Sequence, residues 1–182
     1  MHLDPTFALT LRAAFVLLFV GALIHKLHRF AEFKGTLASY FRGLGLSGMA
    51  LERPAAAIAI ALEAVVVAAC LSPRSGTPAA VSASGVLLLY ALAMAVNLHR
   101  GNVLLDCGCS WGSERQPVRY ALVFRNAVLA ALALTLVLPV SDRPLAALDV
   151  ASTGAAILTA GLLYSAANRL LMTATPSRRM TV

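Results

Sequence analysis

Long apolar runs separated by short polar segments dominate this chain. Five of them approach the roughly 20 residues that a helix needs to cross about 30 Å of hydrocarbon. They cover residues 7–24, 54–71, 79–98, 121–138 and 145–164. The runs are continuous and rich in Ala and Leu, without the alternation that a membrane β-barrel requires. The pattern predicts an all-α fold, a polytopic transmembrane helical bundle with a four-helix core and a fifth span.

The segment after the first run has the periodicity of an amphipathic helix at a membrane interface. Its apolar positions are Phe30, Phe33, Leu37, Tyr40, Phe41 and Leu44, and its charged ones include Glu32, Lys34 and Arg42. We prefer a connector anchored among lipid headgroups, with a lid over the cytoplasmic mouth of the bundle as the alternative. No repeat or long linker interrupts the chain, so we expect one domain over residues 1–172 and a short polar tail over 173–182.

Composition excludes an ordinary soluble domain. Of 182 residues, 59% are hydrophobic and 13% are charged, which makes the lipid bilayer the expected surroundings. Basic residues follow the first run instead of preceding it, so we expect a retained span and no cleaved signal peptide. The net charge of +7 comes without a basic groove, a zinc-finger spacing or a P-loop, so nucleic acid is not an expected partner.

The positive charges are distributed unevenly between the two sides of the predicted bundle. One side receives Lys26, Arg29, Lys34, Arg42, Arg53, Arg100, Arg115, Arg119, Arg169, Arg178 and Arg179. The other side receives only Arg74 and Arg143. Because cytoplasmic loops of membrane proteins carry an excess of Lys and Arg, we expect a multi-pass protein of the cell membrane with its N-terminus outside and loop 99–120 in the cytoplasm.

The strongest chemical signal is Cys107-Gly108-Cys109 in that loop. Two thiols around one glycine can close a strained small-ring disulfide, exchange with a partner thiol, or share a metal. Nearby His99 and Arg100 favour thiolate formation, and Asp106 opposes it. A strained disulfide is easily reduced, so we expect Cys107 and Cys109 to be a catalytic redox pair.

Two other assignments of cysteine and histidine are open. Cys70 lies toward the far end of the second run, where we expect it to serve as a small helix-packing residue. A soft-metal site could combine the thiols of Cys107 and Cys109 with imidazoles, and the candidates are His25, His28 and His99. We favour metal binding less, because histidines beside lysine and arginine at a span end are more often interfacial anchors.

Ionisable and amide side chains inside the spans form a second candidate group. Glu63 lies deep in the second run, where an ionised side chain costs about 2.5 kcal/mol or more unless it meets a partner or a wet cavity. Arg125 and Asn126 in the fourth run are the expected partners, and Arg12 and Asn97 add further polar groups. A functional polar centre and a structural clasp that fixes helix order are nearly equal alternatives.

The ordered features resemble the MauE-like membrane proteins of methylamine utilisation, which are related to DoxX-like bundles. The matching positions, from about residue 26 to 138, are Lys26, Tyr40, Glu63, Asn97, Arg100, Cys107-Gly108-Cys109, Arg125 and Asn126. Relatives often continue the motif as CGCFG, whereas this chain continues it with Ser110-Trp111-Gly112. The resemblance implies a cytoplasmic-membrane protein that supports disulfide formation or maturation of exported partners, often beside a thioredoxin-like protein.

The leading hypothesis is therefore a membrane thiol-disulfide oxidoreductase, or its accessory protein, that uses Cys107 and Cys109. Its supporting polar centre would comprise Glu63, Arg125, Asn126, Asn97, Lys26 and Arg100. A quinone or a thioredoxin-like protein would be the redox partner. The alternatives are a non-catalytic assembly subunit of a membrane complex and, less favoured, the Cys/His metal binder.

Overall fold

The computed structural model describes residues 2–46, 50–72, 76–101 and 119–173. In these ranges the chain forms α1 (Pro5–His28), α2 (Phe30–Gly43), α3 (Glu52–Leu71), α4 (Gly76–His99), α5 (Tyr120–Leu134), a 3₁₀ turn η1 (Thr135–Val137) and α6 (Ala147–Thr173). Five of the helical segments are long and apolar enough to cross a membrane. The predicted all-α bundle with five spans is confirmed, and the chain is a multi-pass membrane protein.

Helix α1 begins where the sequence supplies a cap. The Asp4 carboxylate accepts a 2.8 Å hydrogen bond from the Thr6 backbone N–H, and Pro5 occupies the first helical turn. Both features suit a helix N-terminus, where N–H groups lack intrahelical partners and proline loses no hydrogen bond. At the other end only Arg29 separates α1 from α2.

Helix α4 is the centre of the bundle. It packs against α5 and α3 and contacts α2, while α1 packs against α3 and α6. The apolar core includes Phe15, Phe19, Val66, Leu87 and Leu136. Large aliphatic side chains elsewhere point outward, as expected for helices whose outer faces contact lipid tails.

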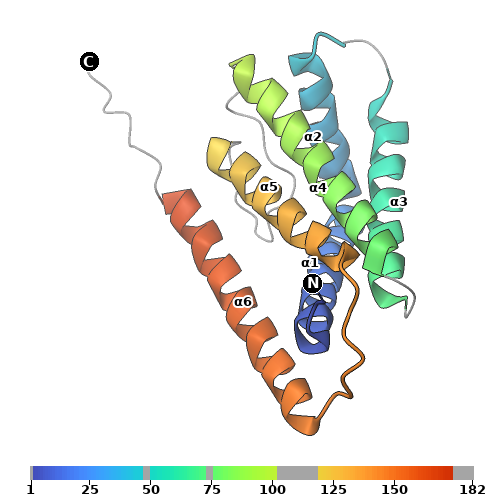
Figure 1. Cartoon of the computed structure of the whole chain (residues 1–182). Coiled ribbons are helices and arrows are strands. Elements are labelled where there is room, and N and C mark those ends of the chain that lie inside the picture. The colour runs from blue at the N-terminus through green and yellow to red at the C-terminus, as the bar shows by residue number, and fades with distance from the viewer. Residues whose placement is uncertain (1, 47–49, 73–75, 102–118, 174–182) are drawn as a thin grey trace.

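Helix α6 lies along one side of the bundle and packs against α1 (Figure 1). Its first turn is tied to the start of α1 by Arg143, which contacts the carboxylates of Asp4 and Asp149 at 3.3 and 2.9 Å. The hydroxyl of Thr6 also donates to Asp149 at 3.0 Å. We call these four residues the terminal clasp.

Helix α2 packs against α3, α4 and α1. Its Phe33 ring lies 5.0 Å from the Lys26 ammonium, so it covers a charged group inside the bundle. This contact is compatible with both predicted roles of α2, a lid over the bundle and a connector among lipid headgroups. The interfacial position of α2 stays a prediction.

Candidate functional site

A charged pair is buried where α1, α3 and α4 meet. The side chain of Lys26 is 2% exposed and that of Glu63 is fully buried, and the Lys26 ammonium forms an ion pair with Oε1 of Glu63. Tyr90 completes a triad, because its hydroxyl accepts from Lys26 at 3.1 Å and donates to Oε1 of Glu63 at 2.8 Å. One carboxylate oxygen thus accepts two hydrogen bonds.

Aromatic rings surround the cation of this triad. The Lys26 ammonium lies 4.8 Å from the centroid of the Tyr90 ring and 5.0 Å from that of Phe33. A cation over an aromatic face is attracted by the ring quadrupole, more strongly when water is excluded. The aliphatic stem and aromatic neighbours make burial of Lys26 less costly than burial of a bare ammonium would be.

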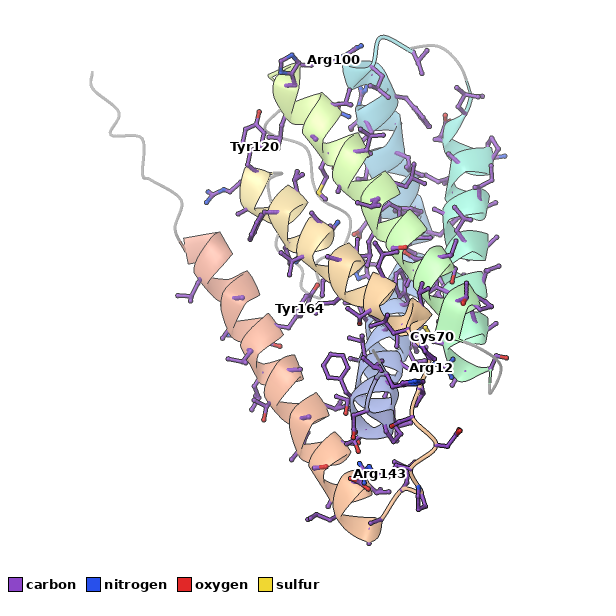
Figure 2. The ribbon with its side chains drawn as sticks, viewed as in Figure 1. Arg12, Cys70, Arg100, Tyr120, Arg143 and Tyr164 are labelled. Carbon is purple, nitrogen blue, oxygen red and sulfur yellow. The ribbon has the colours of Figure 1, made fainter. Side chains whose placement is uncertain are left out.

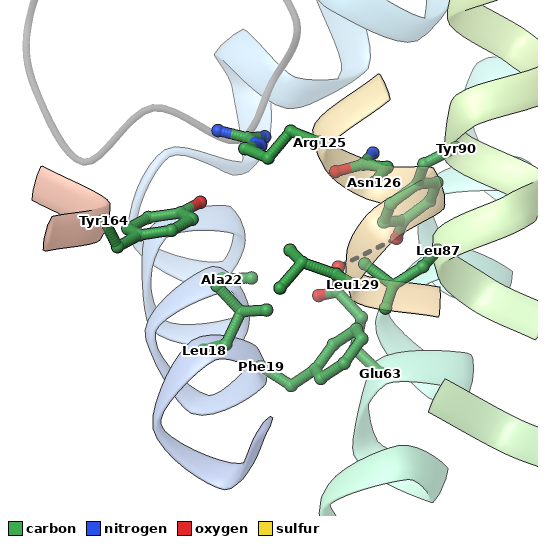
Figure 3. A pocket seen from close by; sticks show the side chains of 10 residues that line it. All are labelled: Leu18, Phe19, Ala22, Glu63, Leu87, Tyr90, Arg125, Asn126, Leu129 and Tyr164. Carbon is green, nitrogen blue, oxygen red and sulfur yellow. Dashed lines mark hydrogen bonds between the residues drawn. The ribbon is translucent and has the colours of Figure 1, made fainter. Parts of the chain in front are cut away.

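A cavity of about 40 Å³ adjoins the triad on the side of α5 and α6 (Figure 3). Its lining is Leu18, Phe19, Ala22, Glu63, Leu87, Tyr90, Arg125, Asn126, Leu129 and Tyr164. The second carboxylate oxygen of Glu63, Oε2, is buried without a hydrogen-bond partner among the described residues. The Arg125 guanidinium lies over the Tyr164 ring, 5.3 Å from its centroid.

The partners of Glu63 differ from those expected from the sequence. We expected Arg125 and Asn126, but the bonds of Glu63 run to Lys26 and Tyr90, while Arg125 and Asn126 line the neighbouring cavity. The cause is the choice of helices that pack against one another. Helix α3 packs on α1 and α4, whereas α5 packs on α4.

Asn97 lies near the end of α4 and Arg100 directly after it, and both have other contacts. The fully buried Asn97 amide donates to the Ala93 carbonyl of its own helix at 3.0 Å. Arg100 donates to the carbonyl of Gly43 at 3.2 Å, which ties the end of α4 to the end of α2. Of the predicted polar centre, Glu63, Arg125 and Asn126 line the cavity, and Lys26 lies next to it through its ion pair with Glu63.

Cys107 and Cys109 lie outside the described residues, so their redox role stays a prediction. The helix ends that flank their loop, at Arg100 and Tyr120, lie toward the end of the bundle opposite Cys70 (Figure 2). Cys70 is buried in the apolar core. Near it, Arg12 donates to the Ser72 carbonyl at 3.0 Å, so Arg12 contacts the end of α3 and not the triad.

The described residues contain no group of three His, Cys, Asp or Glu side chains that could hold a metal ion. The predicted ligands His25, His28 and His99 belong to the described part, whereas Cys107 and Cys109 do not. The metal alternative therefore remains a sequence-based hypothesis.

The sequence profile of a family described as methylamine utilisation protein MauE matches residues 4–139, which include α1 to α5 and the triad. The chain belongs to the MauE family. Its relatives include MauE of Paracoccus denitrificans, 37% identical over 92% of this chain and 89% of the relative. MauE of Paracoccus versutus is 35% identical over 92% of this chain and 88% of the relative. MauE of Methylorubrum extorquens is 35% identical over 90% of this chain and 87% of the relative.

No solved structure matches this MauE-family chain. The family match confirms the predicted resemblance to MauE proteins and extends it toward the N-terminus, because it begins at residue 4. It ends at residue 139, before α6.

Tyr90 is the member of the triad that sequence reasoning missed. Tyrosine within an apolar run is unremarkable, because its ring is compatible with a helix core. One signal was present: Tyr90 precedes Asn97 by seven residues, and residues two turns apart share a helix face. A polar face on α4 could have been inferred from this spacing.

Proposed function

We propose that this protein supports maturation of partner proteins in methylamine utilisation, by thiol-disulfide exchange through Cys107 and Cys109. The observation that carries the proposal is membership of the MauE family together with the Cys107-Gly108-Cys109 motif. The names of the relatives supply the link to methylamine utilisation. The two closely spaced thiols supply the chemistry.

The exchange balances without a bound cofactor. A thiolate of the pair attacks one sulfur of the partner's disulfide, forms a mixed disulfide and releases the other partner sulfur as a thiolate. The second cysteine then attacks the mixed disulfide, which closes the Cys107–Cys109 bond and releases a reduced partner. The reverse sequence oxidises a partner dithiol, and a thioredoxin-like protein or a membrane quinone would reset the pair.

Single substitutions test this proposal. We expect one of Cys107→Ser and Cys109→Ser to abolish mixed disulfides with partners, because it removes the attacking thiol. The other should accumulate them, because it removes the thiol that resolves them. The measurement is acid trapping in cells, alkylation and non-reducing electrophoresis.

Cys70→Ala is the matched control, since it removes a thiol from the core and should leave the trapping pattern unchanged. If both loop variants and the native protein give the same trapped species, the exchange function is ruled out.

The orientation we propose places the N-terminus outside and the cysteine loop in the cytoplasm. Burial of Lys26 in the triad removes it from the count of free loop charges. The remaining Arg29, Lys34, Arg42 and Arg53 still outnumber the two cations Arg74 and Arg143 on the opposite side. Labelling of intact cells with a membrane-impermeant thiol reagent tests it: Cys107 and Cys109 should be spared.

A second candidate function is an assembly subunit of a membrane complex. One observation favours it: Ala57, Ala61, Ala64 and Ala68 are exposed and follow one another at spacings of three or four residues along α3. Small residues at such spacing let two membrane helices approach closely. A stoichiometric complex whose function survives the double change Cys107→Ser and Cys109→Ser would favour this candidate over thiol exchange.

A further inference from the structure

One oxygen of the buried triad has no partner in the described structure. Oε2 of Glu63 is buried, and Glu63 also lines the cavity beside the triad. Figure 3 shows that the Glu63 carboxylate lies beside Tyr90, Leu129 and Phe19, with Arg125 and Asn126 above it. Burying a charged acceptor without a hydrogen bond costs more free energy than burying a neutral one. A hydrogen-bond donor is therefore expected in the cavity.

The size of the cavity restricts that donor. A buried water needs roughly 10–15 Å³ of cavity volume, whereas a cavity that binds benzene has about 150 Å³. The observed volume is about 40 Å³. It therefore has room for a few water molecules.

The charges around the cavity point to the same occupant. The described groups that face it or the triad and can carry charge are Lys26 from α1, Glu63 from α3, Tyr90 from α4, Arg125 from α5 and Tyr164 from α6. Two cations already accompany the single carboxylate. A further cation is disfavoured by repulsion, and an anion would approach the lone pairs of Oε2, so a neutral donor suits the cavity best.

We propose that this cavity holds water and that Lys26, Tyr90 and Glu63 form a proton-exchange site inside the membrane. A proton of the Lys26 ammonium passes to the Tyr90 oxygen while the Tyr90 hydroxyl proton passes to Oε1 of Glu63. The ion pair becomes a neutral amine and a carboxylic acid, with Tyr90 unchanged and total charge conserved. Water hydrogen-bonded at Oε2 connects the carboxyl group to proton exchange outside the triad.

The hydrogen bonds have the order that this transfer requires. Lys26 donates to Tyr90 and Tyr90 donates to Glu63, at 3.1 and 2.8 Å, so each donor already faces its acceptor. Oε1 contacts the triad while Oε2 is left for water. The Glu63 carboxyl group therefore connects Lys26 and Tyr90, through Oε1, to water in the cavity, through Oε2.

The test is infrared spectroscopy of the whole protein in liposomes, recorded over a range of pH in H₂O and D₂O. A protonated carboxylic acid has a carbonyl band that a carboxylate lacks, and the band shifts when deuterium replaces the proton. At neutral pH, where exposed carboxyl groups are ionised, we expect such a band in the native protein, its loss in Glu63→Gln, and its retention in Glu32→Gln, which removes an exposed carboxylate. The double change Cys107→Ser and Cys109→Ser should retain it, so the outcome does not depend on the thiol function.

A second variant tests whether water in the cavity carries the proton exchange, and it removes no charged group. Ala22 lines the cavity, and Ala22→Leu should fill it. We expect the deuterium shift of the carboxyl band to appear more slowly by about tenfold or more, because exchange would then require an opening of the bundle. Glutamate labelled with ¹³C identifies the band as a glutamate band even if Glu63→Gln does not fold.

Two results would overturn the proposal. One is a native protein that has no protonated glutamate band at neutral pH, or whose band is unchanged in Glu63→Gln, which would show that Glu63 stays ionised there. The other is deuterium exchange in Ala22→Leu as fast as in the native protein, which would show that cavity water is not the path.

Discussion

The ion pair of Lys26 with Glu63 joins two spans, α1 and α3, inside the bundle. Each of these side chains alone would leave a charge in an apolar interior, whereas together with Tyr90 they pair the two charges through Oε1 of Glu63. A buried pair of this kind adds little net stability compared with well-packed apolar residues, but breaking it is costly. What it can contribute is specificity, because the two charges meet only in the observed register of α1 against α3.

This balance leads to a prediction for Lys26→Met. The change leaves Glu63 buried beside an apolar side chain, and we expect the free energy of unfolding to fall by about 3–5 kcal/mol. The double variant Lys26→Met with Glu63→Leu should recover most of the loss, because no unpaired charge remains. Denaturant titration in mixed micelles measures both, and equal destabilisation of the single and double variants would contradict the account.

At the scale of elements, the close approach of α4 to η1 depends on a glycine. A Cβ atom added at Gly76 would lie 1.9 Å from the backbone oxygen of Leu136, a distance at which the backbone must move. The first turn of α4 can therefore meet the end of the fourth span only if residue 76 has no side chain.

We predict that Gly76→Ala lowers the free energy of unfolding by about 1–3 kcal/mol, as overpacking in a dense core does. Gly85→Ala is the matched control on the same helix, because nothing lies within 4 Å of its added Cβ. That control should be neutral or slightly stabilising, since alanine favours a helix over glycine. Thermal unfolding of both variants checks the difference, which would vanish if the contact with Leu136 were unimportant.

The elements themselves could be predicted because length and hydropathy dominate a membrane helix. The runs at 54–71 and 79–98 correspond to α3 and α4, and even the fifth run, with Asp149 near its start, is a helix. The partners within the polar centre could not be predicted, because they depend on which helices touch. Glu63 was recognisable from its cost in lipid, but its pairing with Lys26 instead of Arg125 follows from α1, not α5, packing on α3.

At the scale of the whole molecule, the terminal clasp joins the beginning of the bundle to its last helix. Leu3 forms a backbone bridge with Val140, and Arg143 links Asp4 to Asp149. The backbone N–H of Thr6, and to a smaller degree Arg143, lower the pKa of Asp4 below its ordinary value. Helix α6 packs against α1, so the clasp reinforces the attachment that this contact provides.

The depressed pKa of Asp4 predicts a loss of stability in acid. A carboxylate whose pKa is lower in the folded protein stabilises it above the unfolded pKa, and this contribution disappears as the pH falls through the folded pKa. We therefore expect the melting temperature to fall as the pH decreases below about 4, with part of that fall absent in Asp4→Asn. Asparagine keeps the helix cap, so the variant removes the charge alone.

Asp142→Asn is the control, because it removes an exposed charge next to Arg143 in sequence. Melting curves in buffered detergent over this pH range measure the effect. Identical acid profiles for the native protein and Asp4→Asn would show that Asp4 does not contribute.

The buried ammonium also has a consequence for synthesis. The chain is made from its N-terminus, so α1 enters the membrane before Glu63, which follows Lys26 by 37 residues. Lys26 is near the end of α1, and its long side chain can reach the headgroups while the ribosome completes α3. The first span is therefore inserted with its cation at the lipid surface, and arrival of the acidic helix draws that cation inward.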